Sequence, residues 1–133
     1  MEYNTLSLIV NEHEKTLQGA GISTINELLV SGATPSGRSA LAELTGLMDK
    51  CIIGWLNRAD LSRIKGIGAQ YALLLECAGV NTVPELATRN AQNLYDTLKS
   101  INSDKRLVRM MPSLPKVENW VAEAKNLPRA VYY

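Results

Sequence analysis

Residues 60–72 of the chain read DLSRIKGIGAQYA, with two glycines separated by a single isoleucine near the middle. Glycine accepts a positive φ and lets backbone segments approach closely, so we expect a tight turn at Gly66 and Gly68. Ile67, between them, is expected to plug this turn into the hydrophobic core. The pattern predicts a short capped helix, a turn, and a second helix that opens at Gly68.

The start of this second helix is a candidate anion site. The N–H groups of Gly68, Ala69 and Gln70 have no partner inside the helix, and the helix dipole makes that end attractive to an anion. Lys65 and Arg63 add positive side-chain charge beside it. An alternative stays open, because Gly-Ile-Gly also turns between two packed helices without any ligand. If Gly68 has a positive φ, Gly68→Val is expected to cost a few kcal/mol.

The stretch resembles the helix-hairpin-helix motif. That family shows an apolar residue, a residue that is often proline, then Gly-apolar-Gly, and a small residue a few places on. These places are filled here by Ile64, Gly66, Ile67, Gly68 and Ala72, while Lys65 takes the proline position. The resemblance implies that a phosphate of a DNA duplex is the anion, held without reading any base edge.

The chain contains an internal repeat. Leu17–Leu29 aligns with Leu75–Ala87 at a shift of 58, with six of thirteen positions identical. At a shift of 65, a second set of matches follows the i, i+3, i+4, i+7 spacing of one helix face. These are Ile52, Trp55, Leu56 and Ala59, matched by Val117, Trp120, Val121 and Ala124. Each copy is therefore expected to end in an amphipathic helix.

The same alignment pairs the hairpin turn Gly66–Gln70 with Leu8–Glu12, which contains no glycine and one acid, Glu12, with Glu14 nearby. We expect the first copy to keep the packing role of this segment and to have lost any phosphate-binding role. His13 takes the place of Tyr71 on the apolar face, and we expect it to be a half-buried packing residue.

Several residues signal helix ends. Gly21 and Gly79 suit the left-handed residue after a helix, and a Thr followed three residues later by Glu predicts a capping box in each copy. These pairs are Thr24 with Glu27 and Thr82 with Glu85, and further N-caps are expected at Thr34 (before Pro35), Asn90 and Ser103.

No segment alternates as a strand should, so we predict an all-α fold of about eight to ten short helices with brief connections. It is expected to consist of two tandem degenerate helix-hairpin-helix repeats packed as one compact domain over residues 1–133. Repeat 1, with the degenerate hairpin, covers 1–60; repeat 2, with the intact hairpin, covers 61–127; a tail covers 128–133.

Almost the whole chain is similar to the uncharacterised domain-of-unknown-function family numbered four thousand three hundred and thirty-two. That similarity implies the fold, and a DNA-related role only through kinship with helix-hairpin-helix proteins. Outside the hairpin it is carried by Gly32–Arg38, Leu41–Ala42, Thr45–Gly46, Trp55, Ala59–Leu61, Ala78–Val83, Glu85–Ala87, Arg89–Asn90, Asn93–Leu94, Leu107–Arg109, Pro112, Trp120 and Ala124–Lys125.

Charge is distributed unevenly along the chain, although the formal net charge is only +1. Basic residues exceed acidic ones between Lys99 and Lys116, where we expect a short helix with a cationic stripe. Lys105, Arg106 and Arg109 would form the stripe, and Leu107, Val108 and Met111 would face inward. A solvated surface without a ligand is the alternative. Hairpin and stripe together would neutralise about four to six phosphates, which predicts micromolar or weaker, salt-sensitive binding.

The composition excludes other classes of function. The 133 residues are 46% apolar and 20% charged, which is ordinary for a globular protein. One histidine and two distant cysteines predict no zinc site, histidine-based triad or cofactor, and Cys77 is expected to be a core thiol. Without a membrane span or leader, we expect a cytoplasmic protein. Arg38 is expected to form a surface ion pair with a carboxylate or to contact a helix C-terminus, and a phosphate contact is the alternative.

We therefore expect a non-enzymatic, sequence-independent domain that binds duplex or branched DNA, with no catalytic or metal-binding residues. Its binding residues would be Arg63, Lys65, Gly66, Gly68, Ala69, Gln70, Lys105, Arg106 and Arg109. The alternative is a protein-interaction or scaffolding module in which the hairpins only pack. Its partner would meet the acidic first half or the pair Tyr132–Tyr133.

Overall fold

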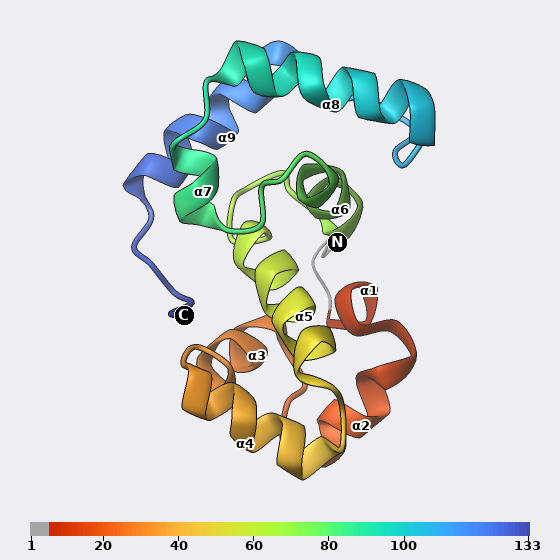
Figure 1. Cartoon of the computed structure of the whole chain (residues 1–133), viewed down its shortest axis with the longest axis vertical. Coiled ribbons are helices and arrows are strands. Elements are labelled where there is room, and N and C mark those ends of the chain that lie inside the picture. Colours follow the sequence, from red (N-terminus) through yellow and green to blue (C-terminus); the bar gives the residue numbers. More distant parts are fainter. Residues whose placement is uncertain (1–5) are drawn as a thin grey trace. The chain divides into compact units, whose positions relative to one another are not determined.

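The computed structural model of the chain describes residues 6–133, apart from the side chains of Ser7, Leu8 and Asn11. These residues form helices and no strand, which confirms the predicted all-α class (Figure 1). The elements are α1 (Leu6–Val10), the 3-10 helix η1 (Asn11–His13), α2 (Glu14–Gly19), α3 (Ile25–Ser31), α4 (Pro35–Thr45), α5 (Asp49–Leu61), α6 (Ala69–Cys77), α7 (Val83–Ala87), α8 (Ala91–Lys105) and α9 (Leu114–Asn126).

The chain divides into two compact units. Unit 1 ends at Asp60 and also contains the last residues, Arg129–Tyr133, whereas unit 2 comprises Leu61–Pro128. Throughout residues 6–133, every helix is too short or too polar to cross a lipid bilayer.

The core of unit 1 forms around α5. Ile52, Leu56 and Ala59, one face of this helix, are all buried, as the helical spacing predicts. Trp55 on the same face packs against His13, with 5.3 Å between the ring centroids. The side chain of His13 is 34% exposed, which confirms its prediction as a half-buried packing residue.

The C-terminal residues of the chain are part of unit 1. The Tyr132 N–H donates to the carbonyl of Ala33 at 2.7 Å, and Val131 is buried. The guanidinium of Arg38 donates to the carbonyl of Gly32, at the end of α3, and to the carbonyl of Tyr132. The predicted contact of Arg38 with a helix C-terminus is therefore confirmed.

Unit 2 repeats the tryptophan arrangement of unit 1. Val117, Trp120, Val121 and Ala124 of α9 are buried, and α7 and α8 both pack against this helix (Figure 1). Tyr71 of α6 lies against Trp120 with 5.4 Å between the ring centroids. The sequence alignment pairs these two residues with His13 and Trp55, so the same ring contact recurs in both units.

The helices α2 and α6 end in the same way. Gly21 and Gly79 have φ values of +88° and +85°, and the N–H of the residue after each glycine bonds back to a carbonyl of the last helical turn. These bonds join Ile22 to Leu17 and Val80 to Leu75, which is the Schellman pattern. The predicted left-handed glycines are thus confirmed.

Most predicted N-caps are confirmed. The side chains of Thr24, Thr34, Thr82 and Asn90 each accept a hydrogen bond from the N–H three residues on, and Thr24 with Glu27 forms a full capping box. The second predicted capping box is incomplete, because the Glu85 carboxylate accepts from the N–H of Asn81. The prediction for Ser103 is wrong, because this residue lies inside α8. Ser113 caps α9 instead, directly before its first turn.

The hairpin turn differs from its prediction in two details. No separate short helix precedes it, since α5 runs for 13 residues to Leu61 and is followed by turns. Gly66, not Gly68, is the left-handed residue, with φ +92°. Gly68 has φ −90° and ψ −175°, an extended conformation that any residue adopts. Ile67 is fully buried, as expected, and its first-copy counterpart Ile9 is 1% exposed.

We predict that Gly66→Ala lowers the free energy of unfolding by about 1–2 kcal/mol, because alanine is strained at positive φ. Space alone accepts the new Cβ, whose nearest neighbour would be Trp120 Nε1 at 3.4 Å. The matched control is Gly54→Ala in the middle of α5, where nothing lies within 4 Å, and it is expected to be neutral or stabilising. Urea denaturation measures both, and equal effects would contradict the assigned turn.

Candidate functional site

The first turn of α6 presents uncapped N–H groups. Gly68 is the N-cap and has no side chain to accept from them, and the first intrahelical bond runs from the Ala72 N–H to the Gly68 carbonyl. Gln70 is exposed, and Gly68 and Ala69 are half-buried. The first turn of α6 therefore has no side-chain cap, which is the condition that the predicted anion site requires.

The charges at the hairpin turn are partly engaged inside unit 2. The guanidinium of Arg63 donates to the carbonyl of Pro128, after the end of α9. Lys65 is exposed, but its backbone N–H donates to Glu123 Oε2 of α9 at 3.3 Å. The Arg63 side chain therefore stabilises unit 2, and the Glu123 carboxylate lies beside the hairpin turn.

The predicted short helix around the cationic stripe is absent, so that prediction is wrong. Lys105 is the last residue of α8, and no helix forms between Arg106 and Ser113. We call residues 106–111 the arginine loop. Val108 is buried, as expected for an inward-facing residue, while Leu107 and Met111 are half-buried. Arg106 and Arg109 therefore belong to one loop rather than to one helix face.

Arg106 adopts an unfavourable backbone conformation. Its φ of +52° makes it the one non-glycine residue with positive φ among residues 6–133. A left-handed conformation costs an L-residue roughly 1–2 kcal/mol. In unit 1 the helix that precedes the tryptophan helix is α4, and it ends at Gly46 with φ +74°. The two units therefore share a left-handed cap at this helix end, but unit 2 places arginine there.

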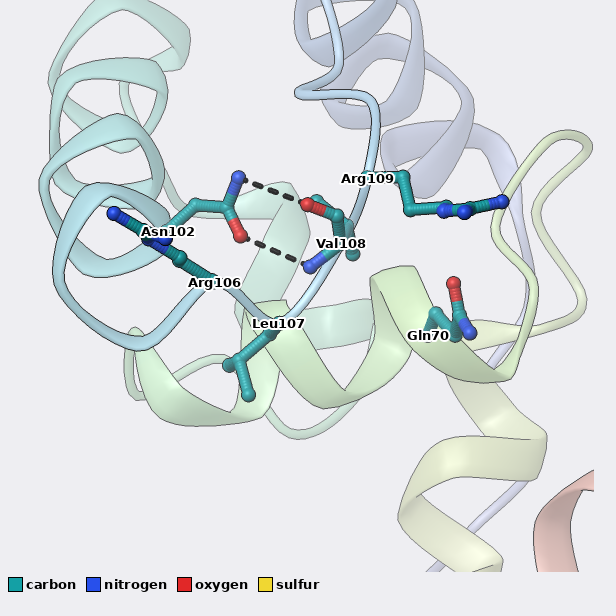
Figure 2. A pocket seen from close by; sticks show the side chains of 6 residues that line it. All are labelled: Gln70, Asn102, Arg106, Leu107, Val108 and Arg109. Atoms are coloured by element: carbon teal, nitrogen blue, oxygen red, sulfur yellow. Dashed lines mark hydrogen bonds between the residues drawn. The ribbon is translucent and has the colours of Figure 1, made fainter.

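Two side chains hold the backbone of the arginine loop. Asn102 of α8 pairs with both backbone groups of Val108: its Oδ1 accepts from the N–H at 2.9 Å, and its Nδ2 donates to the carbonyl at 3.2 Å (Figure 2). The hydroxyl of Tyr71 donates to the carbonyl of Met110 at 2.8 Å. Arg109 therefore lies between two anchored residues.

A depression of about 420 Å³ brings parts of the site together. In Figure 2 the side chain of Arg109 extends to the same side as Gln70, whereas Arg106 extends the other way, beside Asn102. Of the nine predicted site residues, three line the depression: Gln70, Arg106 and Arg109. The other six lie elsewhere in unit 2: Arg63, Lys65, Gly66, Gly68, Ala69 and Lys105.

The guanidinium groups of Arg106 and Arg109 differ from the other arginines. Within residues 6–133, neither has a hydrogen bond, ion pair or ring contact. Most other arginine side chains donate to backbone carbonyls, as those of Arg38, Arg63, Arg89 and Arg129 do. The depression therefore holds two cations whose donors are available to an external acceptor.

The family model described as Domain of unknown function (DUF4332) matches residues 7–127 of the chain. The chain belongs to the DUF4332 family. The family description names no activity or ligand for the DUF4332 chain. Neither the curated proteins nor the solved structures contain a match to it.

A second depression of about 590 Å³ lies between the start of α8 and α9 of the DUF4332 chain. Its charged lining is mixed, with Arg89, Lys125 and Glu118, and Arg89 already donates to the carbonyl of Gly79.

Cys77 is exposed, so its prediction as a core thiol is wrong. Residues 6–133 contain no group of three or more His, Cys, Asp or Glu side chains that suits a metal ion.

Sequence reasoning did not find Asn102 and Tyr71 as contributors to the site. The helical spacing places Tyr71 only on the apolar face of its helix, where its ring packs against Trp120. Asn102 lies three residues before Lys105, the last residue of α8, and its hydrogen bonds to Val108 reach six residues on, into the loop. The one sequence signal for this contact is an asparagine in the last turn of a helix, because its side-chain amide can form hydrogen bonds with the backbone of the loop that follows.

We predict opposite stability changes for two arginines. Arg63→Ala removes a charge-assisted hydrogen bond to Pro128 and should lower the free energy of unfolding by about 1 kcal/mol. Arg106→Gly removes the left-handed strain and should raise it by about 0.5–1 kcal/mol. Thermal unfolding of both variants, followed by circular dichroism, measures the difference. A loss of stability in Arg106→Gly would contradict the strain argument.

Proposed function

We propose that the DUF4332 chain is a non-enzymatic, sequence-independent DNA-binding protein that contacts the phosphate backbone through unit 2. The observation that carries the proposal is the depression that is lined by Gln70, at the open end of α6, and by Arg106 and Arg109, whose guanidinium groups have no partner within residues 6–133. The kinship with helix-hairpin-helix proteins belongs to the same proposal and rests on the Gly66–Gly68 turn and buried Ile67.

The chemistry of the lining suits phosphate rather than bases. A guanidinium donates two parallel hydrogen bonds to phosphate oxygens, and the N–H groups of a helix N-terminus add neutral donors. Asn102 has its amide engaged by Val108 and therefore has little capacity to read a base edge. None of the residues that line the depression is aromatic, so bases have no stacking surface there. Duplex DNA is the expected ligand, ahead of single strands.

A scaffolding function is the second candidate, and one observation favours it. The Glu123 carboxylate on the Lys65 N–H places negative charge at the turn where a phosphate would bind. A partner at the Tyr132–Tyr133 pair would compete with existing contacts, since Arg38 donates to the Tyr132 carbonyl and the Tyr133 hydroxyl donates to Asn57. The titration below separates the two functions.

We predict that the full chain binds a fluorescein-labelled 20-base-pair duplex with a Kd in the micromolar range, on the order of 1–100 μM at 50 mM salt. Fluorescence anisotropy should show weaker binding of the matching single strand. Arg109→Glu should weaken duplex binding about ten-fold or more and reduce the slope of log K against log salt by about 1.

The matched control for this titration is Lys125→Glu, which makes the same change of charge in the second depression of unit 2. At 150 mM salt, charges more than about 8 Å away are screened, so the control should remain close to wild type. A duplex affinity that changes neither with salt concentration nor in Arg109→Glu and Lys125→Glu would contradict the proposal. No binding to any DNA would favour the scaffolding function.

A separate prediction concerns the open end of α6. Gly68 has the extended backbone of an N-cap, so Gly68→Asp should cap the helix and keep or raise stability. The new carboxylate would occupy the N–H groups and repel phosphate, so duplex affinity should fall about five-fold or more. Gly68→Ser is the neutral control for capping. Unchanged affinity in Gly68→Asp would exclude the α6 terminus from the interface.

A further inference from the structure

We propose that the arginine loop is a preformed phosphate-binding loop in which Asn102 and Tyr71 are positioning residues. The inference rests on the proposed function and assigns most of the affinity to this loop rather than to the hairpin turn. Both residues act through the loop backbone, because neither offers its bonded group to solvent ligands: Asn102 bonds Val108, and the Tyr71 hydroxyl bonds Met110.

The positions of these bonds are the first part of the argument. They fix the residue before Arg109 and the residue after it, and one anchor comes from α8 while the other comes from α6. Tyr71 is itself held by its ring contact with Trp120 in the core of unit 2. A loop anchored on both sides loses less conformational entropy when its side chain binds a ligand. Arg109 is therefore presented from a fixed backbone.

The conformation of Arg106 is the second part of the argument. Glycine or asparagine suits a left-handed helix cap, and unit 1 uses Gly46 at the corresponding end of α4. Unit 2 keeps arginine in this conformation although its guanidinium has no partner in residues 6–133. Strained backbone of this kind is concentrated at ligand-binding positions. We infer that the side chain is retained for an external anion.

The hairpin turn is the weaker half of the site. Arg63 is bonded to the Pro128 carbonyl, and the Glu123 carboxylate accepts from the Lys65 N–H. A phosphate at the turn would meet this negative charge, whereas no carboxylate lines the depression beside the arginine loop. The loop therefore has the greater net attraction for a phosphodiester.

The experiment measures duplex binding by Tyr71→Phe in the full chain. This variant removes one hydroxyl and keeps the ring on Trp120, so the fold is preserved while the Met110 anchor is lost. Affinity for the labelled 20-base-pair duplex should fall roughly five-fold. Tyr95→Phe is the matched control, because Tyr95 also packs on the core of unit 2 but its hydroxyl has no hydrogen bond to the arginine loop. It should leave the affinity unchanged. Asn102→Ala provides a second test of the same loop.

A double-mutant cycle separates positioning from general stability. Tyr71→Phe should lower affinity when Arg109 is present and have no further effect in the Arg109→Ala background. Wild-type affinity in both Tyr71→Phe and Asn102→Ala, together with weak binding by Arg109→Ala, would overturn the positioning role and leave the proposed function intact. Equal losses from Tyr71→Phe in both backgrounds would also overturn it. Failure of the wild-type chain to bind duplex DNA would overturn the proposed function itself.

Discussion

The burial of Ile67 is the constraint on which the candidate site depends. This side chain is fully buried between two glycines, so the turn around it cannot move away from the core of unit 2. Gly66 supplies the left-handed backbone that this requires, and Gly68 then begins α6 with no side chain over its first turn. The open helix end, and the position of Gln70 in the depression, both follow from a packing interaction on the opposite side of the turn.

The two units show how a duplicated framework supports one specialised surface. The ring pairs His13–Trp55 and Tyr71–Trp120 have centroid distances of 5.3 and 5.4 Å, so the helix packing is closely similar. The units differ at one helix C-cap, where unit 1 has Gly46 and unit 2 has Arg106 in the same left-handed conformation. Packing is shared, while the charged loop belongs to unit 2.

Local chemistry explains what the sequence predicts well and what it does not. Thr24, Thr34 and Asn90 cap helices through bonds that span three residues, and the helix face of Trp120 follows from spacing alone. The shape of the arginine loop could not be predicted in this way, because it depends on hydrogen bonds that span six residues (Asn102 to Val108) and 39 residues (Tyr71 to Met110). The spacing of Leu107, Val108 and Met111 is typical of a helix face, but the segment is irregular. The hydrogen bonds from Asn102 and Tyr71 hold it, and Pro112 directly precedes Ser113, the N-cap of α9. The burial of Ile67 could be predicted from the sequence. The sequence does not show whether Gly66 or Gly68 adopts the positive φ, because that depends on the hydrogen bonds of the turn.

The return of Arg129–Tyr133 to unit 1 has a consequence for biosynthesis. Because unit 2 comprises Leu61–Pro128, it lies in sequence between the two segments of unit 1, and Arg129–Tyr133 are translated after it. The hydrogen bonds of Ala33 and Arg38 to the backbone of Tyr132 cannot form until Tyr132 has been synthesised. The same holds for the burial of Val131 in the core of unit 1. On the ribosome, the later half of the polypeptide can therefore complete its packing before the earlier half does.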